Sequence, residues 1–454
     1  MKKIFQYIML AVVTIVMASC TSDIEETTAT TGKNNVQLVV GEFPAFGDSQ
    51  TRAIGTTDPG KTSWAEGDEM LLEIDNTTYG KKYATFTYNG KSWKLTSGEL
   101  VYREGDPAYI PHVYYAPNYK WEAGKLVLKE GKVAGTDEYI EGNARITGNG
   151  ETITVSFAGA TRKYSRLRIA TLPNERITVD TEYFTPAGSS DMKWDQNYAL
   201  TSDEKGNAYL YGTFENNSKV TVKYREAALT THTFSQATES AKSYALDATV
   251  ISANSAEEIK SAIEQKVADG KTAIRLNLAS DAGDNEFKAI REAFEKVQEG
   301  TIDLTLIGCK EIPADGLNNQ SGGLEALKSI TLPDVTKIGK NALLFCVDLE
   351  EICAPNVSAI DECAFKGCYN LKKVTLGELT DVRGEANSGG GIFGVTDTGD
   401  LNIDLYLPKN QEVMEFDENQ YIWKPTGESY FASPEDYDNG IFLGYKFKSV
   451  KSWE

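Results

Sequence analysis

A stretch of the chain repeats itself with a period of 22 residues, and this repeat restricts the fold more than any other feature. Residues 327–348 align without gaps on residues 349–370, and a third copy begins at Leu371. The same phases carry apolar residues in each copy, namely Leu327, Leu349 and Leu371; Ile330, Ile352 and Val374; Val335, Val357 and Leu379; Ile338, Ile360 and Val382. A unit this short cannot bury its own apolar face, so successive copies must stack on one another.

The residues before the repeat predict helices. Ser255 and Glu258 form a capping box, apolar residues then recur at helical spacing, and Gly270 closes the segment. A second helix is expected around residues 287–297, with a strand on either side. We therefore expect residues 251–454 to form an α/β leucine-rich-repeat solenoid with a helical N-terminal cap.

Residues 36–250 have a different pattern, with short alternating runs rich in Val, Thr, Tyr and Phe. Such runs predict an all-β fold, and Asn89-Gly90 between two of them predicts a hairpin. The region is long for one sandwich. We expect two packed β-sandwich units with a break near residues 171–185.

The N-terminus has the pattern of an export signal. Residues 1–19 combine a basic start, a short apolar run and small residues, and Cys20 follows directly. This arrangement resembles the bacterial lipoprotein signal, which implies lipidation at Cys20 and anchoring in the outer membrane. An ordinary cleaved signal that happens to end at a cysteine is the alternative. Residues 20–35 are predicted to be an acidic, Thr-rich tether; their acidic run resembles a surface-export signal, or serves only as a solvated linker.

The repeat itself resembles a known family. The pattern Ile/Val-x-Leu-Pro, then Val-x-x-Ile-x-x-x-Ala-Phe-x-x-Cys-x-x-Leu, is similar to the BspA-like leucine-rich repeats of bacterial surface proteins over roughly residues 300–410. This resemblance implies a repeat fold that presents a binding surface. It does not specify the ligand, because members of the family bind varied host, matrix and microbial partners.

The β-rich half resembles the fimbrillin family, the lipoprotein precursors of pilus subunits. Four stretches carry the resemblance: SQTRAIGT (49–56), SWAEGDEMLL (63–72), YYAPNYKW (114–121) and ITVSFAGATRKYSRLRIA (153–170). It implies proteolytic maturation after Arg52 and donor-strand addition from other fimbrial subunits. An exposed linker arginine is the alternative for Arg52. Stalk subunits end with the sandwich, whereas this chain continues, so an accessory or tip role fits better than polymerisation.

Charge and composition argue against several functions. The chain carries 46 basic and 66 acidic residues, a net charge of −20, which opposes binding to nucleic acid. It holds only two histidines, His112 and His232, and no nucleophile motif, so we expect no catalytic residues and no cofactor. Carboxylate pairs are too common in so acidic a chain to be informative.

The candidate ligand groups have simpler explanations. Cys346, Cys353, Cys363 and Cys368 lack the close pairs of a zinc site, so no metal is predicted, although a disulfide between Cys346 and Cys368 is geometrically conceivable. A calcium loop could be imagined, but its spacing is wrong, at Asp397, Asp400, Asn402 and Asp404. An aromatic cluster could bind sugars, but half-buried strand positions explain it better, at Tyr114, Tyr115, Tyr119 and Trp121.

Together these features predict a cell-surface lipoprotein that acts as a fimbrial accessory or tip-type adhesin without catalysis. Its expected partners are other fimbrial subunits and a host or microbial surface protein or glycan. The alternative function is a glycan-binding accessory lipoprotein of a polysaccharide-uptake system, which would also be acidic, lipidated and β-rich.

Overall fold

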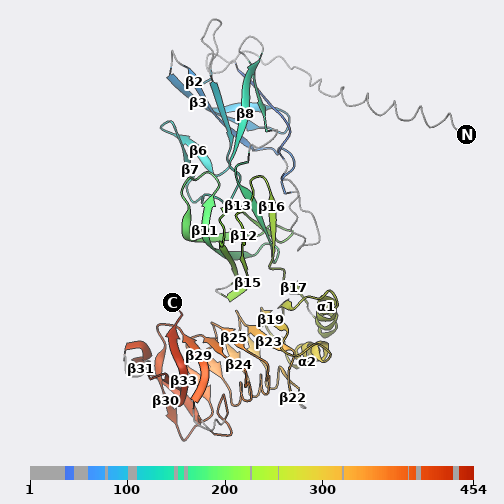
Figure 1. Cartoon of the computed structure of the whole chain (residues 1–454), viewed down its shortest axis with the longest axis vertical. Helices are drawn as coiled ribbons and strands as arrows, with labels where there is room; N and C mark the ends of the chain where they lie inside the picture. The colour runs from blue at the N-terminus through green and yellow to red at the C-terminus, as the bar shows by residue number, and fades with distance from the viewer. Residues whose placement is uncertain are drawn as a thin grey trace, which may run out of the picture.

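The computed structural model describes most of the chain after the predicted tether. The described residues are 36–44, 46, 60–76, 80–100, 110–147, 152–157, 162–224, 227–253, 255–319, 322–386, 388–394, 400–432 and 439–453. Strands make up 48% of the structure and helices 7%. Three β-rich parts follow one another along the long axis of the molecule, in chain order (Figure 1).

The first part is one seven-stranded sheet with the order β1-β9-β8-β5-β2-β3-β4, and a small hairpin of β6 and β7 beside it. Its two edge strands, β1 and β4, contact each other, so the sheet curls around its own core. The strands are β1 (Gln37–Val40), β2 (Glu69–Asn76), β3 (Gly80–Tyr88), β4 (Trp93–Gly98), β5 (Ile110–Tyr115), β6 (Tyr119–Glu122), β7 (Lys125–Leu128), β8 (Ile140–Thr147) and β9 (Thr152–Ser156).

The second part is another seven-stranded sheet, with the order β15-β14-β11-β13-β10-β16 and β12 paired to β11. Alternate residues of its strands are buried, as in β13, and these inward side chains form its core. The strands are β10 (Ser165–Ala170), β11 (Arg176–Pro186), β12 (Lys193–Thr201), β13 (Asn207–Phe214), β14 (Lys219–Tyr224), β15 (Ala227–Thr233) and β16 (Ser243–Asp247).

The N-terminal half is thus all-β as expected, but the predicted sandwich is wrong in form. The sheets curve into barrel-like shapes instead of lying as flat facing layers. Because the first sheet curls until β1 meets β4, one sheet encloses a core that a sandwich would bury between two. The change from the first sheet to the second falls between β9 and β10, earlier than the break expected near residues 171–185.

A buried ion pair joins the first two sheets. Arg162 donates from Nε to one oxygen of Glu138 over 3.1 Å and from a terminal nitrogen to the other over 2.7 Å. The Tyr164 hydroxyl donates to the same carboxylate, and Arg162 also donates to the carbonyl oxygen of Pro44. Glu138 precedes β8 of the first sheet, whereas Arg162 and Tyr164 precede β10 of the second. The hydrogen bonds among them therefore hold the first sheet against the start of the second.

The third part, residues 251–453, contains two sheets and the helices α1 (Ala256–Ala268) and α2 (Asp284–Phe294). The nine-stranded sheet consists of β17 (Ile251–Ser252), β18 (Ala273–Asn277), β19 (Ile302–Ile307), β23 (Leu327–Thr331), β25 (Glu351–Ala354), β27 (Lys373–Leu376), β29 (Asp400–Leu407), β33 (Tyr445–Ser452) and β32 (Ile441–Phe442). The six-stranded sheet consists of β20 (Glu311–Ile312), β24 (Lys337–Ile338), β26 (Ala359–Ile360), β28 (Asp381–Arg383), β31 (Ile422–Ser429) and β30 (Glu412–Asp417). A short pair, β21 (Asn318–Asn319) with β22 (Gly322–Gly323), and the 3-10 turn η1 (Tyr430–Ala432) complete this part.

The predicted register of the repeat is confirmed. Ile330 pairs with Ile352 and Ile352 with Val374 in parallel strands, one repeat apart. On the second sheet, Ile338 pairs with Ile360 and Ile360 with Val382. All of these side chains are buried in one continuous core. The copies therefore stack through their shared apolar phases.

The α/β character predicted for this solenoid is wrong, because the segments that connect the strands do not form helices. Asn341 and Cys363 occupy the same repeat phase and have φ of 56° and 59°, while Phe345 and Gly367 share another phase with φ of 59° and 80°. Two left-handed residues four positions apart interrupt any helix. The amide of Leu343 donates instead to the carbonyl of Ala364 in the next repeat, over 2.9 Å.

The two helices that do form precede the repeat, where they were expected. The Ser255 hydroxyl accepts a hydrogen bond from the Glu258 amide over 3.3 Å, and α1 ends before Gly270, whose φ is 70°. The apolar faces of α1 and α2 join the core of the first repeat strands. No helix among the described residues has the length and apolar character that crossing a membrane requires.

Candidate binding surface

The nine-stranded sheet presents an outer face whose side chains are set in rows by the repeat. One row runs through Glu351, Lys373, Asp404 and Ser449, which are consecutive register partners. We call the uncovered outer positions of β25, β27, β29 and β33 the strand face, and it comprises Glu351, Cys353, Lys373, Thr375, Asp404, Tyr406, Ser449 and Lys451. Their sequence neighbours Ile352, Val374, Leu405 and Val450 point into the core.

The second sheet covers the beginning of this outer face. Arg275 on β18 donates from Nε to the carbonyl of Leu229 on β15 over 2.8 Å. Ile307 on β19 is buried in the core of the second sheet, and Figure 1 shows β15 beside β17 and β19. The contact ends near β23, so the strand face begins where this cover stops.

The strand face is polar and held in place by ion pairs. Lys373 donates to Glu351 over 2.6 Å, and Asp404 accepts from Lys448 over 2.8 Å and from the Ser449 hydroxyl over 2.5 Å. Tyr406 lies between two cations, with the amino nitrogens of Lys373 and Lys451 5.7 and 5.6 Å from its ring centre. An aromatic ring flanked by fixed charges on a partly exposed sheet face is suited to binding the surface of a partner.

Asp404 gives this face a dependence on pH. Its hydrogen bonds with Lys448 and Ser449 lower its pKa from 3.8 to about 2. Because the folded-state pKa is depressed, the resulting stability is present above pH 3.8 and is lost as the pH falls through about 2. We expect Asp404→Asn to lower the free energy of unfolding at pH 7 by at most about 1 kcal/mol, since the pair is partly exposed.

Urea unfolding of both proteins between pH 7 and pH 2.5 measures this difference. The gap between wild type and Asp404→Asn should shrink below about pH 4. The control is Glu418→Gln at an exposed position in the turn between β30 and β31, which should change the free energy of unfolding at pH 7 by less than about 0.5 kcal/mol. A constant gap for Asp404→Asn across the range would show that its carboxylate is not stabilised by these contacts.

The edge of the stack carries two exposed aromatic rings, which form a competing surface. Tyr369 is 79% exposed and Phe345 is 39% exposed, and both lie in turns between the two sheets. The Phe345 ring covers Gly367, where a Cβ atom would lie 2.3 Å from it. Because these rings lie in turns and not on the outer face of the nine-stranded sheet, we treat this edge as the control surface.

The five cysteines after Cys20 are free thiols in the repeat part. Cys346 and Cys368 occupy the same phase, yet each thiol points to a backbone carbonyl, that of Leu317 at 3.7 Å and that of Leu343 at 3.2 Å. Within the described residues, no group of three or more potential metal ligands gathers. Cys309, Cys346 and Cys363 are buried and pack within the fold, whereas Cys353 and Cys368 are partly exposed.

Burial raises the pKa of the thiols of Cys309 and Cys346 to about 12 and that of Cys353 to about 11. Since the thiolate is the reactive form, we expect these three to react with Ellman's reagent at pH 8 at least ~100-fold more slowly in the native protein than in urea. Mass spectrometry of the labelled peptides identifies the sites. Fast native labelling of Cys309 or Cys346 would contradict the burial. A Cys346–Cys368 disulfide would instead remove two thiols from the count in urea.

The other candidate binding residues from the sequence do not form a site in the structure. Tyr115 and Tyr119 are buried, and Tyr114 and Trp121 pack against each other with ring centres 6.3 Å apart, so this cluster is mostly internal. Asp404 is held by Lys448 and Ser449 instead of joining a calcium loop. Cys20, Arg52 and Asp397 lie outside the described residues.

Fold and surface together define a β-rich repeat protein with an open, charged face. Residues 322–388 match the family described as BspA type Leucine rich repeat region (6 copies), so this segment consists of leucine-rich repeats of the BspA type. No curated protein sequence matches the chain. The resemblance of the β-rich half to fimbrillins stays a prediction.

One solved structure, of a provisionally described cell adhesion protein from Bacteroides fragilis NCTC 9343, aligns with 47% of this chain and 92% of its own. The TM-score is 0.27 and the sequence identity is 10%. A likeness of this size does not define a shared fold.

Proposed function

We propose that the chain is a non-catalytic surface adhesin that binds its partner through the strand face. The observation that carries this proposal is the stack of BspA-type repeats at residues 322–388, whose sheet continues through β29 and β33 and so joins the repeats and Tyr406 on one outer face. A stacked sheet holds side chains at fixed spacing, which suits recognition of an extended partner surface. In this account the chain is anchored through a lipid on Cys20 and displayed on the outer membrane.

Intact producing cells test the location. Antibody to the repeat part should label unpermeabilised cells, and external protease should remove the label. Protection of the epitope until the outer membrane is broken would contradict surface display. Assays of the purified mature chain on polysaccharide and protein substrates should detect no turnover, and turnover abolished by one carboxylate substitution would establish an enzyme instead.

A fimbrial accessory role is the finer form of this proposal. The strand β1 lies at the edge of the first sheet, where it pairs in parallel with β9. Its Leu38 and the preceding residue Val36 are buried in the core of that sheet. Cleavage after Arg52 would free the segment that holds β1, and its place could then be taken by a strand from another subunit.

An Arg-specific protease and a synthetic peptide of residues 36–43 test this account. After limited digestion, the body should remain folded and bind the peptide saturably, whereas the intact chain should not. A peptide with Val36 and Leu38 replaced by serine is the control and should not bind. Resistance of Arg52 to cleavage, or unfolding of the digested body, would contradict donor-strand addition.

The glycan-capture alternative has one observation in its favour. A hollow of about 450 Å³ lies between the first two sheets and is lined by Tyr209, Tyr211 and charged side chains that include Lys61 and Asp203. Tyrosine rings beside polar groups can stack on a sugar. Calorimetric titration with neutral oligosaccharides, in wild type and in Tyr209→Ala, would distinguish capture at this hollow from adhesion by the strand face.

A further inference from the structure

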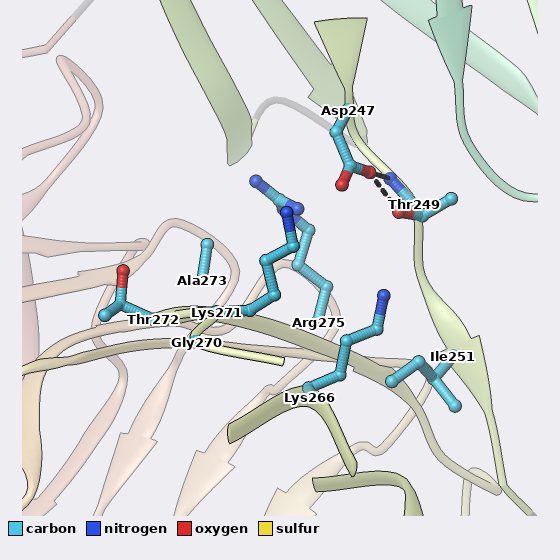
Figure 2. Close-up of a pocket in the computed structure, with 9 residues that line it drawn as sticks. All are labelled: Asp247, Thr249, Ile251, Lys266, Gly270, Lys271, Thr272, Ala273 and Arg275. Carbon is cyan, nitrogen blue, oxygen red and sulfur yellow. Dashed lines mark hydrogen bonds between the residues drawn. The ribbon is translucent and has the colours of Figure 1, made fainter. Parts of the chain in front are cut away.

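A pocket with an excess of positive charge lies where the second sheet meets the repeat part. Its volume is about 220 Å³, and its walls come from the end of β16, from β17, from the C-terminal end of α1 and from β18. Three cations line it, Lys266, Lys271 and Arg275, against the single carboxylate of Asp247. In Figure 2 the side chains of Lys266, Lys271 and Arg275 extend toward the space that they line.

Arg275 is the central group of this pocket. It is only 8% exposed, and its Nε donates to the carbonyl of Leu229. Within the described residues, its two terminal nitrogens have no hydrogen-bond or ion-pair partner, and they face the pocket (Figure 2). Burial lowers the pKa of Arg275, which reflects the loss of water around its charge. A buried guanidinium with two unused donors is costly unless an anion completes it.

The carboxylates near Arg275 are engaged elsewhere. Asp247 accepts from the amide of Thr249 over 2.8 Å and from its hydroxyl. Asp303, on the neighbouring strand, accepts from the Ser329 hydroxyl over 2.6 Å. Neither carboxylate lies within ion-pair distance of Arg275, although both act on its charge from farther away and partly oppose the lowering of its pKa. The partial negative charge at the C-terminal end of α1 stabilises the charge of Lys266 in its last turn. It does not explain why Arg275 is buried.

We infer that this pocket binds a tetrahedral dianion, namely a sulfate or phosphate group. Two excess positive charges match a dianion better than a single carboxylate, and the forked donors of Arg275 can bind two oxygens of such a group at once. The volume exceeds that of the ion, so the group can be free or carried on a sugar. Because Arg275 also holds Leu229 of the second sheet, a bound anion stiffens the joint between that sheet and the repeats.

Calorimetric titration of the mature chain with four probes at constant ionic strength tests the inference. The probes are sodium sulfate, sodium phosphate, glucose 6-sulfate and glucose 6-phosphate, with sodium chloride as the background salt. We expect saturable binding of at least one probe, and a loss of affinity of at least tenfold, on the order of 1.4 kcal/mol, in Arg275→Ala. Binding of sodium sulfate or sodium phosphate would indicate that the ligand of the pocket is a free anion. Binding of the two sugar esters alone would indicate that the ligand is a sulfated or phosphorylated sugar.

Two further variants separate binding from folding. Lys266→Ala with Lys271→Ala removes two cations at partly or fully exposed positions and should also weaken binding at least tenfold, even where Arg275→Ala fails to fold. Lys296→Ala, after α2 and outside the pocket, removes a charge elsewhere and should leave the affinity unchanged. Absence of saturable binding by all four probes, or equal affinity in the double variant and wild type, would overturn the inference.

Discussion

Replacing Phe365 by alanine is expected to lower the free energy of unfolding of the repeat part by about 3–5 kcal/mol, because it opens a cavity at the centre of the stack. Phe365 is 1% exposed, and its ring packs against Phe393 with centres 5.4 Å apart. Its amide donates to the carbonyl of Ile392, which carries the stack beyond the regular repeats. The loss of packing at Phe365 should therefore also destabilise the neighbouring strands β27 and β29.

Tyr369→Ala is the matched control, since it removes an aromatic ring four residues away that is 79% exposed. Its effect should stay within about 0.5 kcal/mol. Urea unfolding gives the energies, and hydrogen exchange shows where protection is lost. Equal stability of Phe365→Ala and Tyr369→Ala would contradict a single hydrophobic core shared by the repeats.

Replacing Glu138 by glutamine is the second large change. The substitution leaves Arg162 buried without its charge partner, with side chains that are 2% and 6% exposed in the pair, so we expect a loss of about 3–5 kcal/mol. The Tyr164 hydroxyl also loses its anionic acceptor. Hydrogen exchange should increase first at the joint between the first two sheets.

Two comparisons isolate the cause. Glu141→Gln removes a half-exposed carboxylate that pairs with Lys163 at 3.5 Å, and it should cost at most about 1 kcal/mol. Replacing both members of the buried pair, Glu138→Leu with Arg162→Met, should recover most of the lost stability, because no unpaired charge remains. A double variant as unstable as Glu138→Gln would mean that packing, not the stranded charge, causes the loss.

The parts of the fold that local signals determine were predictable. Ser255 caps α1 as its sequence pattern indicates, and the 22-residue register of Ile330 and Ile352 follows from the apolar phases alone. The hairpin at Asn89 also forms, although Tyr88 pairs with Trp93, so that four residues connect the strands and not the Asn89-Gly90 pair alone. The Asn89 side chain accepts from the amides of Lys91 and Ser92 and so favours the longer turn.

Other parts depend on contacts that a sequence pattern does not contain. Phe345 and Cys363 are residue types that rarely adopt positive φ, so the loss of helices between the strands was not visible in their identities. The curl of the first sheet depends on contact between β1 and β4, which are distant in sequence.

The candidate sites were predictable to a smaller extent. The strand face follows from the repeat register, but Tyr406 and Lys451 lie beyond the regular copies and join it only because β29 and β33 extend the sheet. The basic pocket was missed. Lys266, Lys271 and Arg275 are a local excess of positive charge in an acidic chain, and that excess was the available signal. The second sheet, which buries Arg275, could not be placed against them from sequence.

The most direct test of the central claim is binding of the mature chain to a panel of immobilised matrix proteins and host glycans, comparing a strand-face variant with an edge variant. Lys373→Ala combined with Tyr406→Ala changes the strand face, and Phe345→Ala combined with Tyr369→Ala changes the exposed edge. We predict that wild type and the edge variant bind the same members of the panel, while the strand-face variant loses at least about tenfold in affinity. Full binding by the strand-face variant, with loss in the edge variant, would contradict the proposed binding surface.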